Sequence, residues 1–586
     1  MLVYGDPEPR TEDARAKLAG IGRALRGAAA MPAGIARHAA LVSAFIDAGA
    51  LAQGVADAGF DARGGRDGRC AAADAAAALA TRLAAAVRCS WDSRFARFAP
   101  PTDALAFDAA ALPATVRTRR AEGFAFYALY PEAYLAAAAE AAADLPAAER
   151  TTVIGIRSIG AALGALVAAA LGAAPPTTLR PVGHPFRREL SVAADLEAAL
   201  LADPAAGFAV ADEGPGLSGS SFGAVADFLE DRGVAPGRIR FFPSHGGAPG
   251  PQAGPRHRDR WRRARRHTAE FDALIAPRLA GWTADLAGDA DGPLEEISGG
   301  AWRRLRYRRE ADWPPANVQA ERRKFLLRTG GGRTWLLKFA GLGRDGERKL
   351  DRARALGAAG FSPAVAGFRH GFLVEEWVAE ARPLDPAGQD ARTLAERVGR
   401  YLGFRALRFP ADAGQGAPLA ALRAMARHNT AESLGEAWAR RLEQRTAGLE
   451  GFEPALRRVE TDNRLHAWEW LSLPDGRLLK ADALDHHAAH DLVGCQDIAW
   501  DVAGAVCELD LGGERAALLA AVERAAARAV DPALIGALTP CYLAFQLGAH
   551  AMAAHGAPPG EADRLAAAVA RYGGLLRRAL GGAERP

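Results

Sequence analysis

Hydrophobic and polar positions change their spacing twice along the chain, and these changes divide it into three regions. In residues 1–125, Ala-rich segments at 35–57 and 71–88 carry apolar positions every three to four residues. This spacing predicts helices. No group of catalytic side chains stands out here, so we expect a helical extension that serves packing or dimerisation.

From residue 126 short apolar runs alternate with helical patterns. We expect strands at 151–156, 177–182, 208–211 and 238–244, and helices at 161–172, 192–202 and 222–232. Strands that alternate with helices predict a doubly wound parallel sheet, with ligands at the carboxyl ends of the strands. The second region is therefore expected to be an α/β domain over residues 126–275.

The expected strand at 208–211 ends in two adjacent acids, Asp212 and Glu213, before a loop of Gly, Pro and Ser. Backbone N–H groups of small residues and the positive end of the following helix attract phosphate. The acids then lie where ribose hydroxyls or a phosphate-bound Mg²⁺ would be. The predicted phosphate cradle is Ser218, Gly219, Ser220 and Ser221. The simpler alternative is a Gly-rich turn and a helix capped by Ser220 or Ser221.

This segment resembles the loop that binds phosphoribosyl pyrophosphate (PRPP) in type I phosphoribosyltransferases, with a spacing about one residue longer than the family pattern. The turn after the first strand resembles the pyrophosphate loop of the same family, and it consists of Arg157, Ser158, Ile159 and Gly160. The resemblance implies that Mg²⁺-PRPP binds between the two loops, with Asp212 and Glu213 as catalytic residues.

Three further features stand out in the first 275 residues, and two of them are open to two interpretations. The strand-like aromatic segment within 122–135 packs in the core or forms a stacking wall beside the sugar-phosphate site. Arg187 and Arg188 follow GHPF, where the transferase family carries loop residues. The basic run 256–266 predicts a solvated helix face, with RNA binding as the sharper alternative.

From residue 290 the pattern predicts antiparallel strands broken by one helix, and after residue 381 mostly helices. We expect a two-lobed domain over 290–578, with an N-lobe at 290–380 and a C-lobe at 381–578. It resembles the aminoglycoside phosphotransferase and choline kinase branch of the protein-kinase-like fold. The fold class expected for the whole chain is thus multidomain α/β and α+β.

The N-lobe resemblance depends on TWLLK, the helix after it, and the segment FLVEEWV. It implies that Lys338 contacts the phosphates of ATP and that Glu347 orients Lys338 through an ion pair. Glu376 and Val378 would form the hinge that binds the adenine edge.

The C-lobe resemblance depends on WLSLPDGRLLKAD and QDIAWDVAGA, within 461–505. It implies a strand, a turn and a strand that ends in Asp482 as the main Mg²⁺ ligand, followed by a helix with a structural Asp501. The usual H-G-D-x-x-x-x-N pattern is absent. Glu469 stands in the place of the metal-binding Asn, and Asp462 is the candidate catalytic base. A degenerate nucleotide-binding domain is the alternative.

Histidines in DALDHHAAHDL are open to two interpretations. His486 and His490 are four residues apart between carboxylates, a spacing that suits zinc. The alternative is that His486, His487 or His490 contacts phosphates or substrate beside a Mg²⁺-ATP site.

Composition narrows the class of protein. A chain of 586 residues is too long for one core and predicts two or three domains. Five scattered Cys without CxxC fit a reducing cytoplasm and exclude a Cys-built zinc module. A net charge of +4 argues neither for nor against binding to nucleic acid. The chain start shows no secretory pattern, and the apolar runs at 133–144 and 161–174 are too short or weak to span a bilayer.

Together these features predict a cytoplasmic, bifunctional transferase that uses Mg²⁺, ATP and PRPP on a pentosyl-phosphate or nucleoside-like metabolite. Its expected partners are small molecules. We expect no binding to a membrane or to nucleic acid, and whether the chain forms a homodimer is left open. A non-catalytic nucleotide or PRPP sensor is one alternative. A nucleic-acid-associated protein that uses residues 256–266 is the other.

Overall fold

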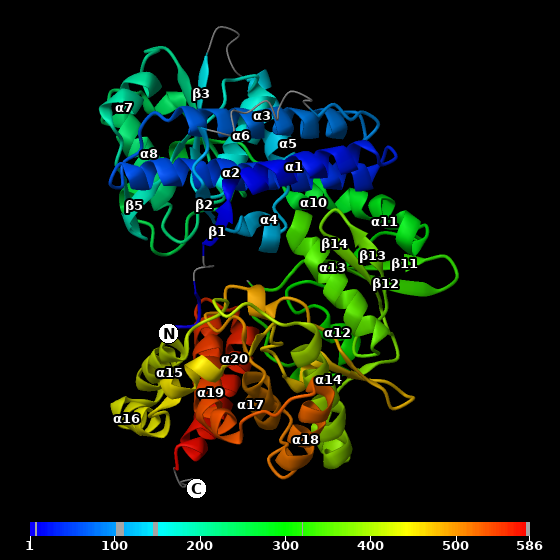
Figure 1. Ribbon diagram of the computed structural model, residues 1–586. Coiled ribbons are helices and arrows are strands. Elements are labelled where there is room, and N and C mark those ends of the chain that lie inside the picture. Colours follow the sequence, from blue (N-terminus) through cyan, green and yellow to red (C-terminus); the bar gives the residue numbers. More distant parts are fainter. Residues whose placement is uncertain (6–8, 101–110, 145–149, 319, 582–586) are drawn as a thin grey trace.

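The computed structural model describes residues 1–586 except 6–8, 101–110, 145–149, 319 and 582–586. Figure 1 shows N-terminal helices and a parallel sheet in the upper part, and a mostly helical part below. An antiparallel sheet with one long helix, α13, lies on the right between them.

The N-terminal region is helical as predicted, with α1 (Ala14–Ala29), α2 (Ile35–Ala62) and α3 (Ala71–Asp92). Small residues let these helices approach the α/β region closely. A Cβ on Gly49 of α2 would lie 2.6 Å from the side chain of Ala162. Ala162 belongs to α6 (Gly160–Leu171), so α2 and α6 pack almost backbone to backbone.

The predicted doubly wound sheet is confirmed. Its parallel strands are β3 (Thr151–Ile156), β4 (Thr177–Leu179), β7 (Gly207–Ala211), β8 (Ile239–Phe242) and β9 (Arg265–Arg266). The helices around them are α5 (Pro131–Ala143), α6, α7 (Ala194–Leu200), α8 (Ser220–Glu230) and α9 (Pro255–Arg263). The spatial order is β4-β3-β7-β8-β9, so the winding direction reverses between β3 and β7. Ligands of such sheets bind outside the carboxyl ends of the strands at this reversal.

The aromatic segment 122–135 does not form the expected strand. It forms the short helix α4 (Glu122–Phe126), a turn, and the start of α5. Phe124, Phe126 and Tyr130 are all buried. A short apolar run that is buried on every side has no period that separates strand from helix.

Residues 290–380 follow the order expected for a kinase-like N-lobe. The antiparallel sheet has the order β10 (Glu295–Glu296), β11 (Lys324–Thr329), β12 (Arg333–Phe339), β14 (Phe372–Glu376) and β13 (Val365–Arg369). Helix α13 (Gly343–Ala358) connects β12 to β13. Before the sheet lie α10 (Phe271–Leu274) and α11 (Leu279–Ala287).

The remaining part is helical with two small sheets, one of three strands and one of two. Its helices are α12 (Arg303–Arg306), α14 (Ala391–Arg408), α15 (Leu419–Leu434), α16 (Glu436–Arg445), α17 (Ala499–Glu508), α18 (Arg515–Ala526), α19 (Pro532–Ala554) and α20 (Pro559–Ala579). The predicted strand, turn and strand are β17 (Trp470–Ser472) and β18 (Leu478–Lys480), paired antiparallel. Short strands β15 (Arg382–Pro383), β16 (Arg458–Val459) and β19 (Gln496–Asp497) complete this part.

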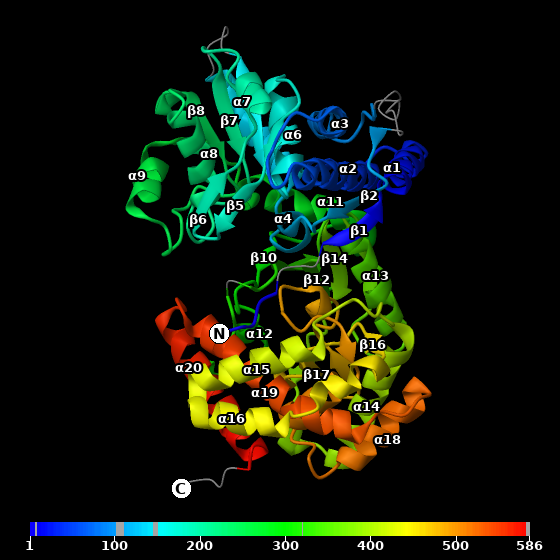
Figure 2. The same ribbon diagram turned by 60° about the vertical axis from the view of Figure 1, so that its left-hand side comes forward.

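The hydrophobic core does not divide at the expected domain boundaries. One cluster of buried side chains contains Leu41 and Phe45 of α2 together with Phe339 and Phe372 of the antiparallel sheet. The start of the chain belongs to the other end of the molecule, where Val3 joins the core of the helical part and Asn429 of α15 bonds Leu2. Figures 1 and 2 both place the N-terminus beside α15.

Within the described part of the chain, two helices, α2 and α19, are long and apolar enough to cross a membrane. In each, 67% of the apolar window is buried inside the fold, as in the core helices of globular proteins.

Candidate functional site

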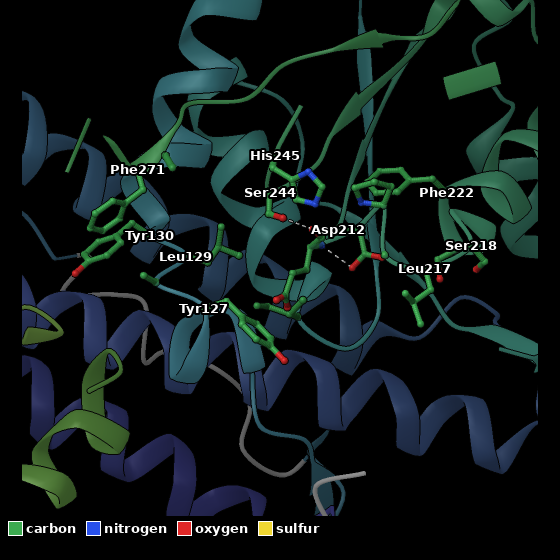
Figure 3. A pocket seen from close by; sticks show the side chains of 18 of the residues that line it. Tyr127, Leu129, Tyr130, Asp212, Leu217, Ser218, Phe222, Ser244, His245 and Phe271 are labelled. Atoms are coloured by element: carbon green, nitrogen blue, oxygen red, sulfur yellow. Dashed lines mark hydrogen bonds between the residues drawn. The ribbon is translucent and has the colours of Figure 1, made fainter. Parts of the chain in front are cut away.

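A cavity of about 740 Å³ lies at the carboxyl ends of the parallel strands, where the winding reverses. We call it the switch-point cavity. Figure 3 shows Asp212 at its centre, with Tyr127, Tyr130 and Phe271 on one side and Leu217 and Ser218 on the other. Two predicted loops reach it, through Ile159 after β3 and residues 212–218 after β7.

The acid pair, Asp212 and Glu213, lies in the wall of this cavity. Asp212 Oδ1 accepts a hydrogen bond from the backbone N–H of Glu213 at 2.8 Å. Glu213 Oε2 accepts one from Gly123 N–H of α4 at 3.1 Å. Burial raises the pKa of Asp212 to about 7. Burial, with the neighbouring charges of Asp212 and Glu122, raises the pKa of Glu213 to about 8. Near neutral pH the pair therefore holds protons that it would release to solvent when a cation binds the carboxylates.

The predicted cradle lies at the N-terminus of α8. Gly219 is the N-cap, with φ +63°, so the alternative in which Ser220 or Ser221 caps the helix is wrong. Ser218 Oγ donates to Ser220 Oγ at 2.9 Å, and Ser220 Oγ donates to the Pro185 carbonyl at 2.9 Å. The hydroxyls are thus engaged by the hairpin of β5 (Pro181–His184) and β6 (Arg187–Leu190), while Ser221 also lines the cavity.

The side chain of Arg157 does not reach the cavity, which corrects its predicted contact with a diphosphate. Its Nε lies 3.0 Å from Asp57 Oδ1, and its guanidinium also pairs with Asp67. Both acids come from the N-terminal helical region, which no pattern near Arg157 could indicate. Ser158 and Gly160 flank Ile159 in the turn and lead into α6.

Cationic and aromatic side chains complete the cavity wall. Arg188, Arg323 and His245 line it, as does Tyr127, whose side chain is 51% exposed. Most aromatic side chains of 122–135 pack in the core, as one of the two interpretations expected, and Tyr127 is exposed in the turn after α4. Whether Tyr127 stacks on a ligand stays a prediction. In the basic run, Arg256 and Arg260 pair with Asp227 of α8, which favours the solvated helix face.

The second group of polar residues lies where the antiparallel sheet meets the helical part. We call Lys338, Asp482, Asp485 and His486 the lysine–aspartate centre. Lys338 is the penultimate residue of β12, and its Nζ pairs directly with Asp482. Burial alone would lower the pKa of Lys338, but the carboxylate of Asp482 raises it above its ordinary value. Burial would raise the pKa of Asp482, yet Lys338 and His486 hold it well below its ordinary value.

Glu347 does not contact Lys338, and this prediction is wrong. Glu347 lies on the exposed face of α13. The helix turns about 100° per residue, so Lys349 takes the inward face instead. Lys349 Nζ lies 2.8 Å from Asp485 Oδ2. The buried carboxyl group of Glu375 in β14 also lies near Lys338, and burial raises its pKa to about 7.

Three side chains of this centre could hold a metal ion. The ligand atoms of Asp482, Asp485 and His486 lie within 4.8 Å of one another. Glu469 is not among them, since its carboxylate pairs with Lys480 Nζ at 2.8 Å. Burial would lower the pKa of His486, but Asp482 and Asp462 raise it to about 10. A cationic His486 suits a phosphate oxygen better than a metal ion.

Asp462 is fully buried and does not lie open to a bound hydroxyl. Its carboxylate accepts a hydrogen bond from Tyr401 and lies 3.4 Å from Lys480 Nζ. The backbone N–H groups of Asp462 and Asn463 donate to Asp501 at 2.7 and 2.9 Å. The structural role expected for Asp501 is confirmed, and Asp462 shares it.

At the expected hinge, Glu376 ends β14 with an exposed side chain. The carbonyl of Val378 accepts a hydrogen bond from Arg306 at 2.8 Å, and the guanidinium of Arg306 lies over the Trp377 ring. An adenine at this edge would therefore meet Arg306 as well as the backbone.

The other two histidines lie apart from the metal-ligating cluster. His490 Nε2 lies 2.7 Å from Tyr127 Oη, and His487 is buried near Glu460. The pairing of His486 with His490 in a zinc site is not formed.

Sequence reasoning missed Asp485, Lys349, Lys480 and Glu375. Two signals were available. The apolar and small positions of α13 place residue 349 on the same face as 346, 353 and 356. Lys480 is also the inward residue of β18, two positions before Asp482.

Helix α4 lies between the two sites. On one side Gly123 donates to the acid pair. On the other, the Phe126 carbonyl accepts from Arg322 at 2.7 Å, and Arg322 also lies 3.5 Å from Asp485. Figures 1 and 2 both show α4 between the upper and lower parts.

No protein-family model and no curated protein sequence matches the chain. Among solved structures, it is similar to choline kinase LicA from Streptococcus pneumoniae, at 14% identity and a TM-score of 0.29, over 43% of this chain and 89% of that one. It is also similar to a choline/ethanolamine kinase family protein from Mesorhizobium loti, at 16% identity, a TM-score of 0.30, and 52% and 96% of the chains. A third is macrolide 2'-phosphotransferase MphH from Brachybacterium faecium, at 18% identity, a TM-score of 0.32, and 53% and 99%.

The TM-scores are below 0.5, so these similarities carry no argument about function. The kinase interpretation depends on the geometry of the lysine–aspartate centre. PRPP transfer finds no support in the reported matches and stays a prediction.

Proposed function

We propose that the chain is an ATP-dependent phosphotransferase that acts on a hydroxyl group of a small molecule. The observation that carries this proposal is the ion pair of Lys338 with Asp482, with Asp485 beside it, between the antiparallel sheet and the helical part. A cation and two carboxylates converging there match what phosphoryl transfer requires: a charge for the phosphates and oxygen ligands for a metal.

The donor set fits Mg²⁺. Asp482 and Asp485 offer carboxylate oxygens, the ligands that this ion prefers. When bound, Mg²⁺ would neutralise charge on the transferred phosphoryl group. Lys338 would move from Asp482 to the ATP phosphates. His486, held cationic between Asp462 and Asp482, would donate to a phosphate oxygen.

Asp462 acts as a support in this proposal. It fixes Lys480 and His486 and does not take the proton of the acceptor hydroxyl. Phosphoryl transfer depends mainly on positioning and charge stabilisation, so a buried carboxylate that orients cations is a useful contribution.

The test is consumption of ATP by the full chain with Mg²⁺ and a panel of alcohols, which includes choline, ethanolamine, an aminoglycoside and a macrolide. Turnover with one acceptor, lost in Asp482→Ala, supports the proposal. ATP binding without turnover of any acceptor supports a degenerate nucleotide-binding domain, and absence of ATP binding overturns both.

We infer a second function for the switch-point cavity, the binding of a sugar phosphate such as PRPP. It rests on the acid pair and the N-terminus of α8, which meet where ligands of doubly wound sheets bind. Arg188 adds positive charge for a second phosphate group, while Arg323, which also lines the cavity, pairs with Asp272 and Glu296.

Calorimetric titration of the full chain with Mg²⁺-PRPP and with ribose 5-phosphate tests this inference. Binding with release of diphosphate in the presence of an acceptor indicates a transferase, and binding without release indicates a sensor. No binding of either ligand overturns it.

A further inference from the structure

A cluster of three metal-ligating side chains lies in the shared core, apart from both sites described above. His38 comes from α2, Glu132 from α5, and His370 from the turn between β13 and β14. Their exposed fractions are 0%, 0% and 2%. We call this cluster the buried triad.

The two imidazoles converge on one carboxylate oxygen. Nε2 of His38 lies 2.6 Å from Glu132 Oε1, and Nε2 of His370 lies 3.0 Å from the same atom. The ligand atoms of all three residues lie within 4.8 Å of one another. The other oxygen of the carboxylate, Glu132 Oε2, is buried and has no hydrogen-bond partner among the described residues.

Hydrogen bonds alone do not satisfy both oxygens of this carboxylate. One oxygen takes two donors, while the other is desolvated with none. A buried acceptor without a partner destabilises the fold, and more so when it is charged. A metal ion held by both oxygens of Glu132 would satisfy Oε2 and draw the two Nε2 atoms onto itself.

We propose that the buried triad binds a divalent transition-metal ion of the Zn²⁺ class, with His38 and His370 through Nε2 and Glu132 through both oxygens. Two imidazoles and a carboxylate form a ligand set that Zn²⁺ accepts, and bidentate Glu132 brings the donor atoms to four.

The surroundings of the triad match those of a structural metal centre. The other nitrogen of His38, Nδ1, lies 2.9 Å from Ser90 Oγ, a contact that fixes the ring orientation. Aromatic rings of Trp91, Phe95, Tyr130 and Trp282 pack around the histidines.

The triad also joins three parts of the chain that the sequence pattern separates. An ion there would tie the N-terminal helices and α5 to the antiparallel sheet. Binding energy at such a site adds directly to folding stability. This inference does not depend on the activity of either candidate site.

The experiment measures metal in the full chain, purified without chelator and then dialysed with Zn²⁺ or with Co²⁺. We expect one equivalent of metal beyond any lost in Asp482→Ala, which removes a carboxylate ligand from the cluster that also contains His486, the only other such cluster in the described part of the chain. Bound Co²⁺ should show the visible absorption of a four-coordinate site, and a chelator should lower the Tm of the wild type.

Two variants and one control assign the site. Glu132→Gln and His370→Ala should each lose that equivalent and the Co²⁺ absorption. His550→Ala, a histidine on α19 outside the triad, should retain both. If the variants do not fold, the wild-type measurements still decide: a wild type that binds neither ion beyond the His486 site overturns the proposal. Metal that persists in folded Glu132→Gln and His370→Ala also overturns it.

Discussion

Carboxylates of the same type have opposite proton affinities in the two candidate sites. Burial raises the pKa of Asp212 and Glu213, and the contacts of their side chains are to backbone N–H groups. Asp485 is buried and Asp482 partly so, but Lys338 and Lys349 hold their pKa values well below the ordinary range. At neutral pH the first site therefore holds protons that a cation can displace, and the second holds fixed charge.

The acid pair should make stability depend on pH. Its folded pKa values, about 7 and about 8, lie above the ordinary values of 3.8 and 4.5. As pH rises, the two carboxyl groups ionise in the unfolded chain before they ionise in the folded chain. The stability that the pair contributes is therefore fully present below about pH 4 and is lost as the pH rises toward 8. Asp212→Asn with Glu213→Gln should therefore be more stable than the wild type at pH 8, by about 1–3 kcal/mol after solvent screening.

Denaturant unfolding at pH 5 and pH 8 measures this difference, which should shrink at the lower pH. Glu197→Gln is a matched control in the same domain, because its carboxylate is exposed and paired with Arg232. A double variant that is less stable than the wild type at pH 8 would contradict the assigned environment.

A second prediction at this scale concerns the lysine–aspartate centre. Lys338→Ala and Asp482→Ala should each lower kcat/KM for ATP-dependent phosphorylation by about 100-fold or more, the scale of one contact to transition-state charge. Glu347→Ala should change it little, because Glu347 lies on the exposed face of α13. Steady-state kinetics with circular dichroism as a folding control would measure this. Equal losses of kcat/KM in Glu347→Ala and Lys338→Ala would contradict this expectation and would support the ion pair between Glu347 and Lys338 that the sequence predicted.

Elements with a clear period and a local cause could be predicted from the sequence. Strand β3, helix α6 and the β17–β18 hairpin follow from apolar runs and turn residues close in the chain. Arg157 could not be placed, because its partners Asp57 and Asp67 come from a distant region. The positions of Lys338 and Asp482 in the sequence were useful for predicting the lysine–aspartate centre, because the fold brings the ends of β12 and β18 together.

Close approach of elements makes one glycine decisive. A Cβ on Gly155 in β3 would lie 2.1 Å from the Gly160 carbonyl oxygen at the start of α6. Gly155→Ala must push α6 from the sheet, which should cost about 1–3 kcal/mol. It should also weaken sugar-phosphate binding, because Ile159 of the same turn lines the cavity.

Thermal unfolding and calorimetric titration check this expectation. Gly237→Ala serves as the control, because a Cβ there would meet open space. Equal stability of the two variants would show that the β3–α6 contact tolerates a methyl group.

At the scale of the whole molecule, the two candidate sites belong to one structure. Helix α4 contacts the acid pair through Gly123 and the lysine–aspartate centre through Arg322. The sequence predicts a domain boundary near 275–290. One cluster of buried side chains continues across this point, since it contains side chains of both the N-terminal helices and the antiparallel sheet. The N-terminal helices and the antiparallel sheet therefore cover each other's apolar side chains.

The kinase-like part should therefore not fold alone. In the full chain one face of its sheet is buried with the N-terminal helices, through Phe325, Leu327, Leu337, Phe339, Phe372 and Val374. Residues 290–586 expressed alone would expose this face, and an apolar patch of that kind drives aggregation. They would also lack Val3, which packs in the helical core. We expect this fragment to be insoluble or to unfold without a cooperative transition, and co-expression with residues 1–289 should restore a soluble complex. Size-exclusion chromatography and thermal unfolding would measure both, and a soluble, cooperatively unfolding fragment would show that the shared core is dispensable.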